Sequence, residues 1–293
     1  MKVRFDRNVA SELSELSEYS YLKQVLDCLD IPSNWDVTIK SSNYSNPPVQ
    51  TAPVTGRKNL LIYLSEDFRI VDKSVIDGYD FVAKCYLSNK QQGCYAFPIG
   101  FEKDAGAFFD FVPWEQREID IFYAGNLNEN RKELYKELFG LKWVPQGVFD
   151  RVYLSRFNKL LPDTINSGGL SIHFTGGFKK GLNPQEYMSL LCRSKVVLCP
   201  KGFHSTETFR HYEAIRAGCI LWSEKLPDAW MYENSPVVQV ENFNGVIRDI
   251  KKFLRDGEMV RAKHLSTKSW WDEVLAPKCV ANRLSKRVRQ CQG

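Results

Sequence analysis

The sequence of 293 residues lacks the features that mark several common protein classes. No apolar run approaches the roughly 20 residues that cross a bilayer, and residues 1–20 are charged and polar where a secretory signal needs an apolar core. The eight cysteines form no C-x-x-C pair, and several lie inside apolar runs, so reduced and mostly buried thiols are expected. These absences predict a cytoplasmic protein without a disulfide framework.

Metal and nucleic-acid motifs are also absent. The sequence contains no H-E-x-x-H motif and no D-x-D triplet, so a protein-bound metal is not expected. The net charge is only +5, and the basic residues form no stripe interleaved with aromatics, so a nucleic-acid partner is not expected. Only NRLSKRVRQ, near the C-terminus, is dense in cations; it fits either a solvated helix face or a weak peripheral contact with anionic lipid.

What is present is an alternation of apolar and polar segments that predicts an α/β protein of two domains. Residues 116–265 alternate strands and helices at the spacing of βαβ units in a parallel sheet, with helices over 131–139, 184–192, 207–217 and 245–254. Residues 1–115, with the strands VRF, WDVTIK and NLLIYL, form a less regular N-terminal domain. Residues 266–293 are expected to form a helical segment that packs back toward that domain.

The segment CPKGFHSTETFRHYEAIRAGC predicts an anion-binding turn between a strand and a helix. Ligand sites of parallel sheets lie at the carboxyl ends of the strands, where loops lead into helix N-termini. Gly202 lets the backbone approach a ligand, and Ser205 or Thr206 is expected to cap the helix. Thr206, Arg210 and Glu213 then share one helix face, on which Arg210 suits a diphosphate and Glu213 a ribose diol. The plain alternative is a surface ion pair between Arg210 and Glu213.

Two other strand ends are predicted to complete this site. Gly125 and Arg131 follow the strand IDIFYA and are placed to meet a diphosphate from a second side, although an ordinary βα turn explains them equally well. A Gly-Gly pair follows the strand LSIHFT, where a flat base can lie against the backbone. The predicted substrate-binding residues are Gly125, Arg131, Thr175, Gly176, Gly177, Lys201, Gly202, His204, Ser205, Thr206, Thr208, Arg210 and Glu213.

At this point the residues resemble a known family. CPKGFHSTETFRHYEAIRAGCILWS is similar to the C-terminal signature of exostosin-type glycosyltransferases, in which a Cys-Pro-basic-Gly turn leads to a Phe-Arg-x-x-Glu-Ala helix and then Gly-Cys. The resemblance covers roughly residues 122–254, and AKCYLSNKQQGCYAFPIGF resembles the late N-terminal domain more loosely. It implies a GT-B fold, with two Rossmann-like domains facing across a cleft, the donor held mainly by the C-terminal one.

The resemblance also implies an activity. Such enzymes are usually inverting, use UDP-sugars and need no catalytic metal, so the expected reaction moves a sugar from a UDP-sugar, such as UDP-xylose or a UDP-hexose, to a glycan hydroxyl. No cofactor is expected beyond the nucleotide sugar as co-substrate. A GDP-fucose-type transferase and a non-catalytic nucleotide-binding protein of the same fold remain alternatives. Many eukaryotic relatives carry a transmembrane anchor, which is not seen here, and the N-terminal domain is short.

Inversion requires a general base that deprotonates the acceptor hydroxyl. In a two-domain enzyme this base is expected from the N-terminal domain. Glu66 and Asp67 follow the apolar strand NLLIYLS, at a strand end, and they are the predicted catalytic residues, with Glu66 preferred. A helix cap or a turn explains the pair equally well.

Overall fold

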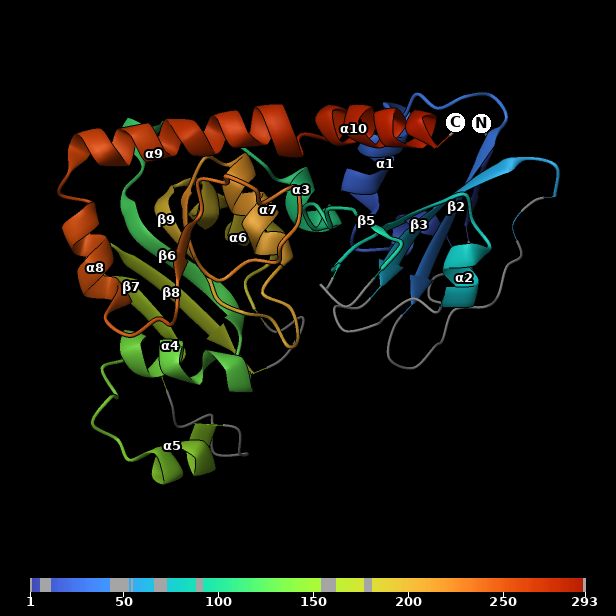
Figure 1. Ribbon diagram of the computed structural model, residues 1–293. Coiled ribbons are helices and arrows are strands. Elements are labelled where there is room, and N and C mark those ends of the chain that lie inside the picture. The colour runs from blue at the N-terminus through green and yellow to red at the C-terminus, as the bar shows by residue number, and fades with distance from the viewer. Residues whose placement is uncertain are drawn as a thin grey trace. The chain divides into compact units, whose positions relative to one another are not determined.

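The computed structural model describes residues 2–5, 12–42, 53, 55–65, 73–87, 92–153, 162–176 and 181–291. The chain divides into two compact units, which are described separately (Figure 1). Unit 1 comprises Met1–Gly106, Pro227–Ser235 and Asp272–Gly293, and unit 2 comprises Ala107–Leu226 and Pro236–Trp271. The division therefore differs from the predicted one: the first boundary falls before residue 115, the C-terminal segment begins after residue 266, and a short excursion returns to unit 1.

Unit 1 is built on a parallel sheet with the strands in sequence order. Apolar side chains of β3 are fully buried, which explains why a continuous apolar run forms this central strand. The run YAFPIGF contributes only the two residues of β5 to the sheet. The elements of unit 1 are β1 (Val3–Phe5), a 3-10 turn (Leu13–Glu15), α1 (Tyr19–Asp27), β2 (Trp35–Ser42), β3 (Lys58–Ser65), α2 (Lys73–Asp77), β4 (Phe81–Lys84), β5 (Tyr95–Ala96), α3 (Lys103–Ala107) and α10 (Pro277–Gln290).

The late segments of the chain are bound firmly into unit 1. Tyr21 of α1 is fully buried and donates a hydrogen bond to the carbonyl of Leu275, 2.6 Å away. Trp230, in the excursion, stacks on Tyr95 with ring centroids 5.9 Å apart and donates its indole N–H to the carbonyl of Ala96 at 2.8 Å. The guanidinium of Arg283 in α10 lies 4.4 Å from the centre of the Trp230 ring. These contacts make both segments part of the unit 1 structure.

Unit 2 is built on a six-stranded sheet of order β11-β10-β9-β6-β8-β7, in which only β7 is antiparallel. β6 and β8 match the predicted strands IDIFYA and LSIHFT, and β7 is an addition that the sequence does not predict. The strands are β6 (Ile119–Asn126), β7 (Thr164–Ser167), β8 (Leu170–Thr175), β9 (Ser194–Cys199), β10 (Ile220–Glu224) and β11 (Val238–Val240).

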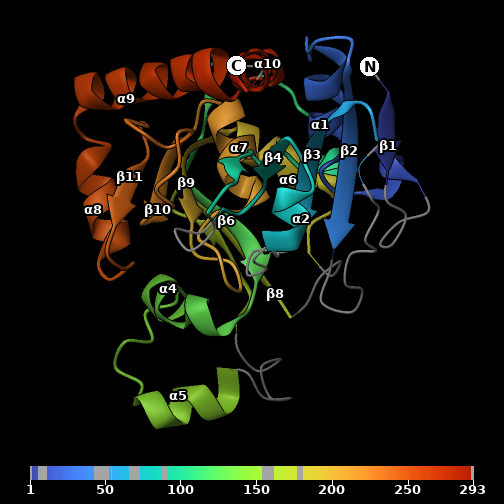
Figure 2. The same ribbon diagram turned by 45° about the vertical axis from the view of Figure 1, so that its right-hand side comes forward.

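Helices cover both faces of this sheet (Figure 2). Alternate residues of β6 point to opposite faces: Tyr123 packs in the core with α4 and α8, whereas Phe122 contacts Tyr187 of α6, with ring centroids 5.8 Å apart. The helical elements are 3-10 turns at Trp114–Gln116 and Glu129–Arg131, α4 (Lys132–Leu138), α5 (Gln146–Tyr153), α6 (Pro184–Cys192), α7 (Phe209–Arg216), α8 (Val246–Phe253), α9 (Gly257–Trp270) and a π-helical turn (Trp271–Leu275) that ends in unit 1.

The strand order creates a switch point in unit 2. From β6 the chain moves to β8 on one side of β6, and then crosses to β9 on the other side. The connections leaving β6 and β9 therefore run in opposite directions, and ligands of open α/β sheets bind in the crevice at such a point. No helix in the described part of the chain is both long and apolar enough to cross a bilayer.

Candidate functional site

The candidate site lies at the carboxyl ends of β6, β8 and β9, which are neighbours in the unit 2 sheet (Figure 1). Asn126, the last residue of β6, pairs in register with Thr175, the last residue of β8. The Thr175 hydroxyl donates a hydrogen bond to Asn126 Oδ1 at 2.7 Å, so these two strand ends are tied together by side chains. The β9 end leads through Cys199 into the loop of the predicted anion site.

That loop is held by residues from the other side of the switch point. Asn130, in the turn after β6, donates its Nδ2 to the carbonyls of Gly202 (2.6 Å) and Phe203 (2.9 Å). Arg131 donates Nε to the carbonyl of Lys201 at 3.2 Å. Within the loop, the amide of Gly202 donates to the carbonyl of Ser205 at 2.8 Å. The structure thus brings together two segments that the sequence separates by about seventy residues.

The helix after the loop begins later than predicted. Thr208 is the N-cap of α7, so the expectation that Ser205 or Thr206 caps it is wrong, and Thr206 shares no helix face with Arg210. The cap position follows from His211, whose Nδ1 accepts the backbone N–H of Thr208 at 3.2 Å. Its Nε2 lies 2.9 Å from Ser223 Oγ, so the neutral ring donates there. Burial and the nearby Arg210 cation lower the pKa of His211 to about 3, and the ring is uncharged at neutral pH.

Two buried guanidinium groups converge at the centre of the site. A side-chain carbon added to Gly125 would lie 2.7 Å from the Tyr123 hydroxyl, 2.8 Å from Arg210 Nη2 and 3.0 Å from Arg131 Nη1. Glycine at this position therefore leaves a small space that is lined by three polar groups. Arg210 donates to the carbonyl of Ala124 and lies 4.9 Å from the centre of the Tyr123 ring, whereas Arg131 donates Nη1 to the carbonyl of Asn126 at 2.8 Å.

These two cations have no carboxylate partner within salt-bridge distance among the described residues. Nε and Nη1 of Arg210 are buried without a hydrogen-bond partner in the same part of the chain. Burial lowers the pKa of Arg131, and the neighbouring positive charge of Arg210 lowers it further. Burial opposes the charge of Arg210 as well, but nearby groups, among them Tyr187 and Glu213, raise the pKa of Arg210 overall. Two desolvated like charges side by side are costly unless an anion binds between them, because burial without a counter-ion is unfavourable. The arrangement is therefore suited to a phosphate or diphosphate group.

Glu213 lies one turn beyond Arg210 in α7, as predicted, but it is not a surface residue. Its side chain is buried, and its Oε2 accepts a hydrogen bond from the Tyr187 hydroxyl at 2.6 Å. The alternative of an exposed ion pair between Arg210 and Glu213 is wrong, since both side chains are buried. A buried carboxylate held by a tyrosine in this way keeps a fixed orientation.

The remaining predicted residues have varied surroundings. His204 and Gly176 are exposed, Gly202 is buried, and Lys201, Ser205, Thr206 and Thr208 are half-buried. Glu66, Asp67 and Gly177 lie outside the described residues, so their placement stays a prediction. In the part of the chain that the structure describes, no three His, Cys, Asp or Glu side chains gather as a metal-binding group.

Several residues of the site are missed by sequence reasoning. Tyr123 reads as one more apolar strand residue, yet its hydroxyl borders Gly125. The buried amide of Asn128, in the turn after β6, has neither its nitrogen nor its oxygen paired within the described structure. Glu224, at the end of β10, accepts the backbone N–H of Lys201 at 2.6 Å. For Asn128 and Glu224 the usable signal is position, because they lie at or just beyond the carboxyl end of a strand, whereas Tyr123 lies within β6 and carries no such signal.

No protein-family model matches the chain, and no curated protein sequence matches it. Among solved structures, a glycosyltransferase from Rickettsia africae ESF-5 matches with a TM-score of 0.50 and 7% identity, over 99% of this chain and 97% of that chain. The GtfA/B complex matches with a TM-score of 0.44 and 10% identity, over 94% of this chain, which spans only 60% of that one. An alpha,alpha-trehalose 6-phosphate synthase from Burkholderia multivorans gives a TM-score of 0.48 and 10% identity, over 92% of this chain and 74% of that one.

At such low identity the match to the Rickettsia africae structure supports the fold alone. The resemblance to exostosin-type enzymes stays a prediction at the level of the family. The fold itself agrees with the sequence analysis: the chain has an α/β fold of the GT-B type, with two Rossmann-like domains.

Proposed function

We propose that the protein is a glycosyltransferase that binds a nucleotide diphosphate sugar at the carboxyl edge of the unit 2 sheet. The observation that carries this proposal is the pair of buried guanidinium groups, Arg131 and Arg210, that meet over Gly125 with no carboxylate of the described residues within salt-bridge distance. The planar fork of arginine matches two phosphate oxygens, and two such forks match a diphosphate. The GT-B fold is compatible with this chemistry but does not by itself establish it.

In the proposed reaction, Arg131 and Arg210 stabilise the negative charge that develops on the departing nucleoside diphosphate. Two fixed cations in a desolvated site supply the positive charge that a divalent metal supplies in other transferases, so we propose metal-independent transfer. Glu213 is proposed to bind the ribose diol, with Tyr187 holding its carboxylate in place. The loop amides after Cys199 and Thr175 at the end of β8 are proposed to line the rest of the donor.

Transfer is proposed to invert the anomeric configuration, with Glu66 or Asp67 as the base that deprotonates the acceptor hydroxyl. The proposed donor is a UDP-sugar, either UDP-xylose or a UDP-hexose, and the proposed acceptor is a glycan hydroxyl. Analysis of the product by NMR tests the stereochemistry directly, because a retained anomeric configuration contradicts the assignment.

Calorimetric titration with UDP in the presence of EDTA tests the donor site. We expect binding by the wild-type protein and at least about tenfold weaker binding by Arg210→Ala, because a charge-assisted hydrogen bond contributes about 1.5 to 3 kcal/mol. Arg151→Ala, which removes an exposed arginine of α5, is the matched control and is expected to bind like the wild type. Equal affinity of Arg210→Ala and wild type contradicts the proposed site.

The same preparation distinguishes the enzyme from a pure binding protein. Slow release of UDP from a UDP-sugar, in the presence of EDTA and without acceptor, is expected of the enzyme. A donor that binds and stays intact with every acceptor offered supports the non-catalytic alternative. Binding of GDP in preference to UDP supports a GDP-fucose-type transferase instead.

A further inference from the structure

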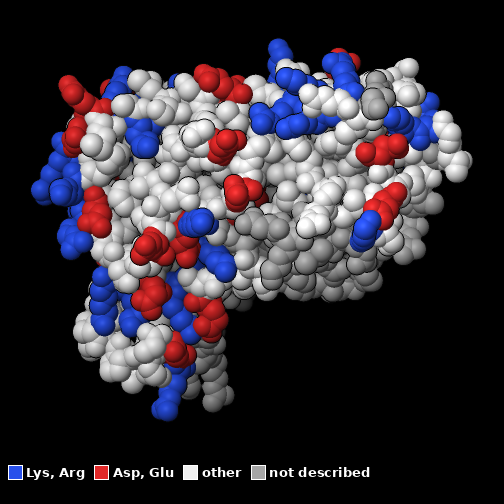
Figure 3. All heavy atoms as spheres, in the orientation of Figure 1, with Lys and Arg blue, Asp and Glu red and all other residues white. Residues whose placement is uncertain are grey.

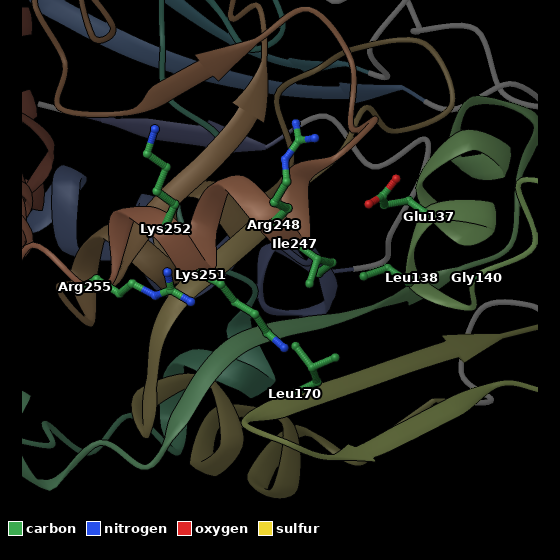
Figure 4. Close-up of a pocket in the computed structure, with 9 residues that line it drawn as sticks. All are labelled: Glu137, Leu138, Gly140, Leu170, Ile247, Arg248, Lys251, Lys252 and Arg255. Atoms are coloured by element: carbon green, nitrogen blue, oxygen red, sulfur yellow. The ribbon is translucent and has the colours of Figure 1, made fainter.

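A positively charged hollow lies in unit 2, away from the candidate donor site. It is formed by α8, by the end of α4 and by the start of β8, and it encloses about 660 Å³ (Figure 4). Its cations are Arg248, Lys251, Lys252 and Arg255, which are spaced i, i+3, i+4 and i+7 and therefore lie on one side of α8 and its C-terminal turn. Figure 3 shows blue side chains gathered at the left of the view, where Figure 1 places α8.

The charge in this hollow is poorly balanced. Arg248 pairs with Asp249, 3.0 Å away, and Glu137 of α4 pairs with Lys142 and accepts the backbone N–H of Gly245 at 2.9 Å. Lys251, Lys252 and Arg255 form no ion pair with any carboxylate in the described ranges. Three free cations around one concavity produce a positive potential that attracts a ligand with more than one negative charge.

Helix stability alone does not account for this arrangement. Lysines in the last turn of a helix are favoured by the helix dipole, which explains Lys251 and Lys252. Arg255 follows the C-cap Leu254 and is favoured in the same way, but Arg248 lies in the first turn of α8, where the dipole disfavours a cation. The apolar face of the same helix, with Val246 and Ile250, is buried in the core, and this fixes the direction in which the cations project.

The hollow and the donor site lie at opposite ends of the strand β8. Leu170, which lines the hollow, is the first residue of β8, and Thr175, at the donor site, is the last. Five residue steps of about 3.3 Å separate them by about 17 Å. Figure 4 shows Lys251 extending from α8 toward Leu170, along this amino-terminal edge. One small ligand therefore does not occupy both places.

We propose that this hollow is a second anion site, which binds a small ligand carrying at least two phosphate charges. The volume lies within the range of small-molecule sites, and five of the nine lining residues are charged, with Leu138, Leu170 and Ile247 as the apolar part of the lining. Because the cations are solvent-exposed, binding depends on electrostatic attraction and weakens as ionic strength rises.

Calorimetric titration with inorganic pyrophosphate at low salt tests the proposal. The wild type is expected to bind at two sites, and Arg210→Ala is expected to keep the site on α8. The Lys251→Gln/Lys252→Gln variant is expected to bind at the α8 site about tenfold more weakly or worse, which corresponds to about 1.4 kcal/mol. The matched control is Lys278→Gln/Lys286→Gln, which neutralises two exposed lysines of α10 and is expected to behave like the wild type.

Two outcomes overturn the proposal. If Lys251→Gln/Lys252→Gln binds pyrophosphate with the stoichiometry and affinity of the wild type, the hollow is not an anion site. If pyrophosphate does not bind at α8, but vesicles of phosphatidylserine sediment the wild type and not this variant, the phosphate comes from a lipid surface and not from a small ligand. A far-ultraviolet circular dichroism spectrum confirms that α8 is intact in the variant.

Discussion

Replacing Gly125 by alanine tests the centre of the candidate donor site with a single methyl group. The backbone of Gly125 does not have a positive φ, so alanine fits the local conformation and the effect is one of space alone. The added carbon would lie within 3.0 Å of Tyr123 Oη, Arg210 Nη2 and Arg131 Nη1, which is closer than carbon normally approaches nitrogen or oxygen. At least one of these groups must move.

None of the three groups moves without loss. Tyr123 is fully buried, Arg210 is held by the carbonyl of Ala124, and Arg131 is held by the carbonyls of Asn126 and Lys201. Overpacking of this kind costs about 1 to 3 kcal/mol of unfolding free energy. The loss of one charge-assisted contact with the diphosphate costs about 1.5 to 3 kcal/mol of binding, which raises the Kd for UDP about ten- to hundredfold.

Urea unfolding and calorimetric titration with UDP measure the two effects separately. The matched control is Gly257→Ala at the start of α9, where an added carbon meets no atom within 4 Å. This control shares the loss of backbone freedom in the unfolded chain and is expected to be neutral or stabilising by up to about 1 kcal/mol. If Gly125→Ala binds UDP with wild-type affinity, the diphosphate does not lie over Gly125 and the argument for the site fails.

Three further predictions follow from the same region and from the proposed base. Tyr187→Phe removes the hydrogen bond to the buried Glu213, and it is expected to lower the unfolding free energy in urea by about 1 to 3 kcal/mol and to weaken UDP binding; unchanged values for both would exclude a positioning role. Burial lowers the pKa of His211 from its ordinary value of 6.5 to about 3 in the folded protein, so the unfolded chain takes up a proton that the folded chain does not, and stability is lost as the pH falls from 6.5 toward 3. Urea unfolding across this range is expected to show a shallower loss for His211→Gln, and equal slopes would contradict the assignment. Glu66→Gln or Asp67→Asn is expected to lower kcat about 100- to 10,000-fold with the Kd for UDP unchanged, as measured by UDP release and titration; full turnover in both variants would place the base elsewhere.

Local sequence signals predict a helix correctly where neighbouring residues set its bounds. The helix Pro184–Cys192 has the predicted bounds, and its start has a local cause: Pro184 occupies its first turn and Asn183 caps it, accepting the amide of Glu186 at 2.9 Å. For the helix Phe209–Arg216 the predicted start, residue 207, is two residues too early. Ser205, Thr206 and Thr208 are equally good caps by residue type, and the choice depends on His211, whose partner Ser223 lies in the strand β10.

The site was predictable in its location but not in its contacts. Strand ends and a Gly-containing loop identified Gly125, Arg131 and Arg210, because those signals are local. The convergence of the two arginines was left open, since it depends on β6 and β9 being neighbours, which a single sequence does not specify. The hairpin that adds β7 had a local signal, the Gly168-Gly169 turn with positive φ at both residues, which the sequence analysis did not use.

The interleaving of the two units has a consequence for the order in which they fold during synthesis. All of unit 2 has left the ribosome once Trp271 has emerged, whereas unit 1 still lacks α10 and the carbonyl that Tyr21 binds. The residues made first must therefore wait for the residues made last. Because both units are built from separate segments, no single cut in the chain yields either unit complete. An isolated unit 1 therefore requires a design that joins its three segments.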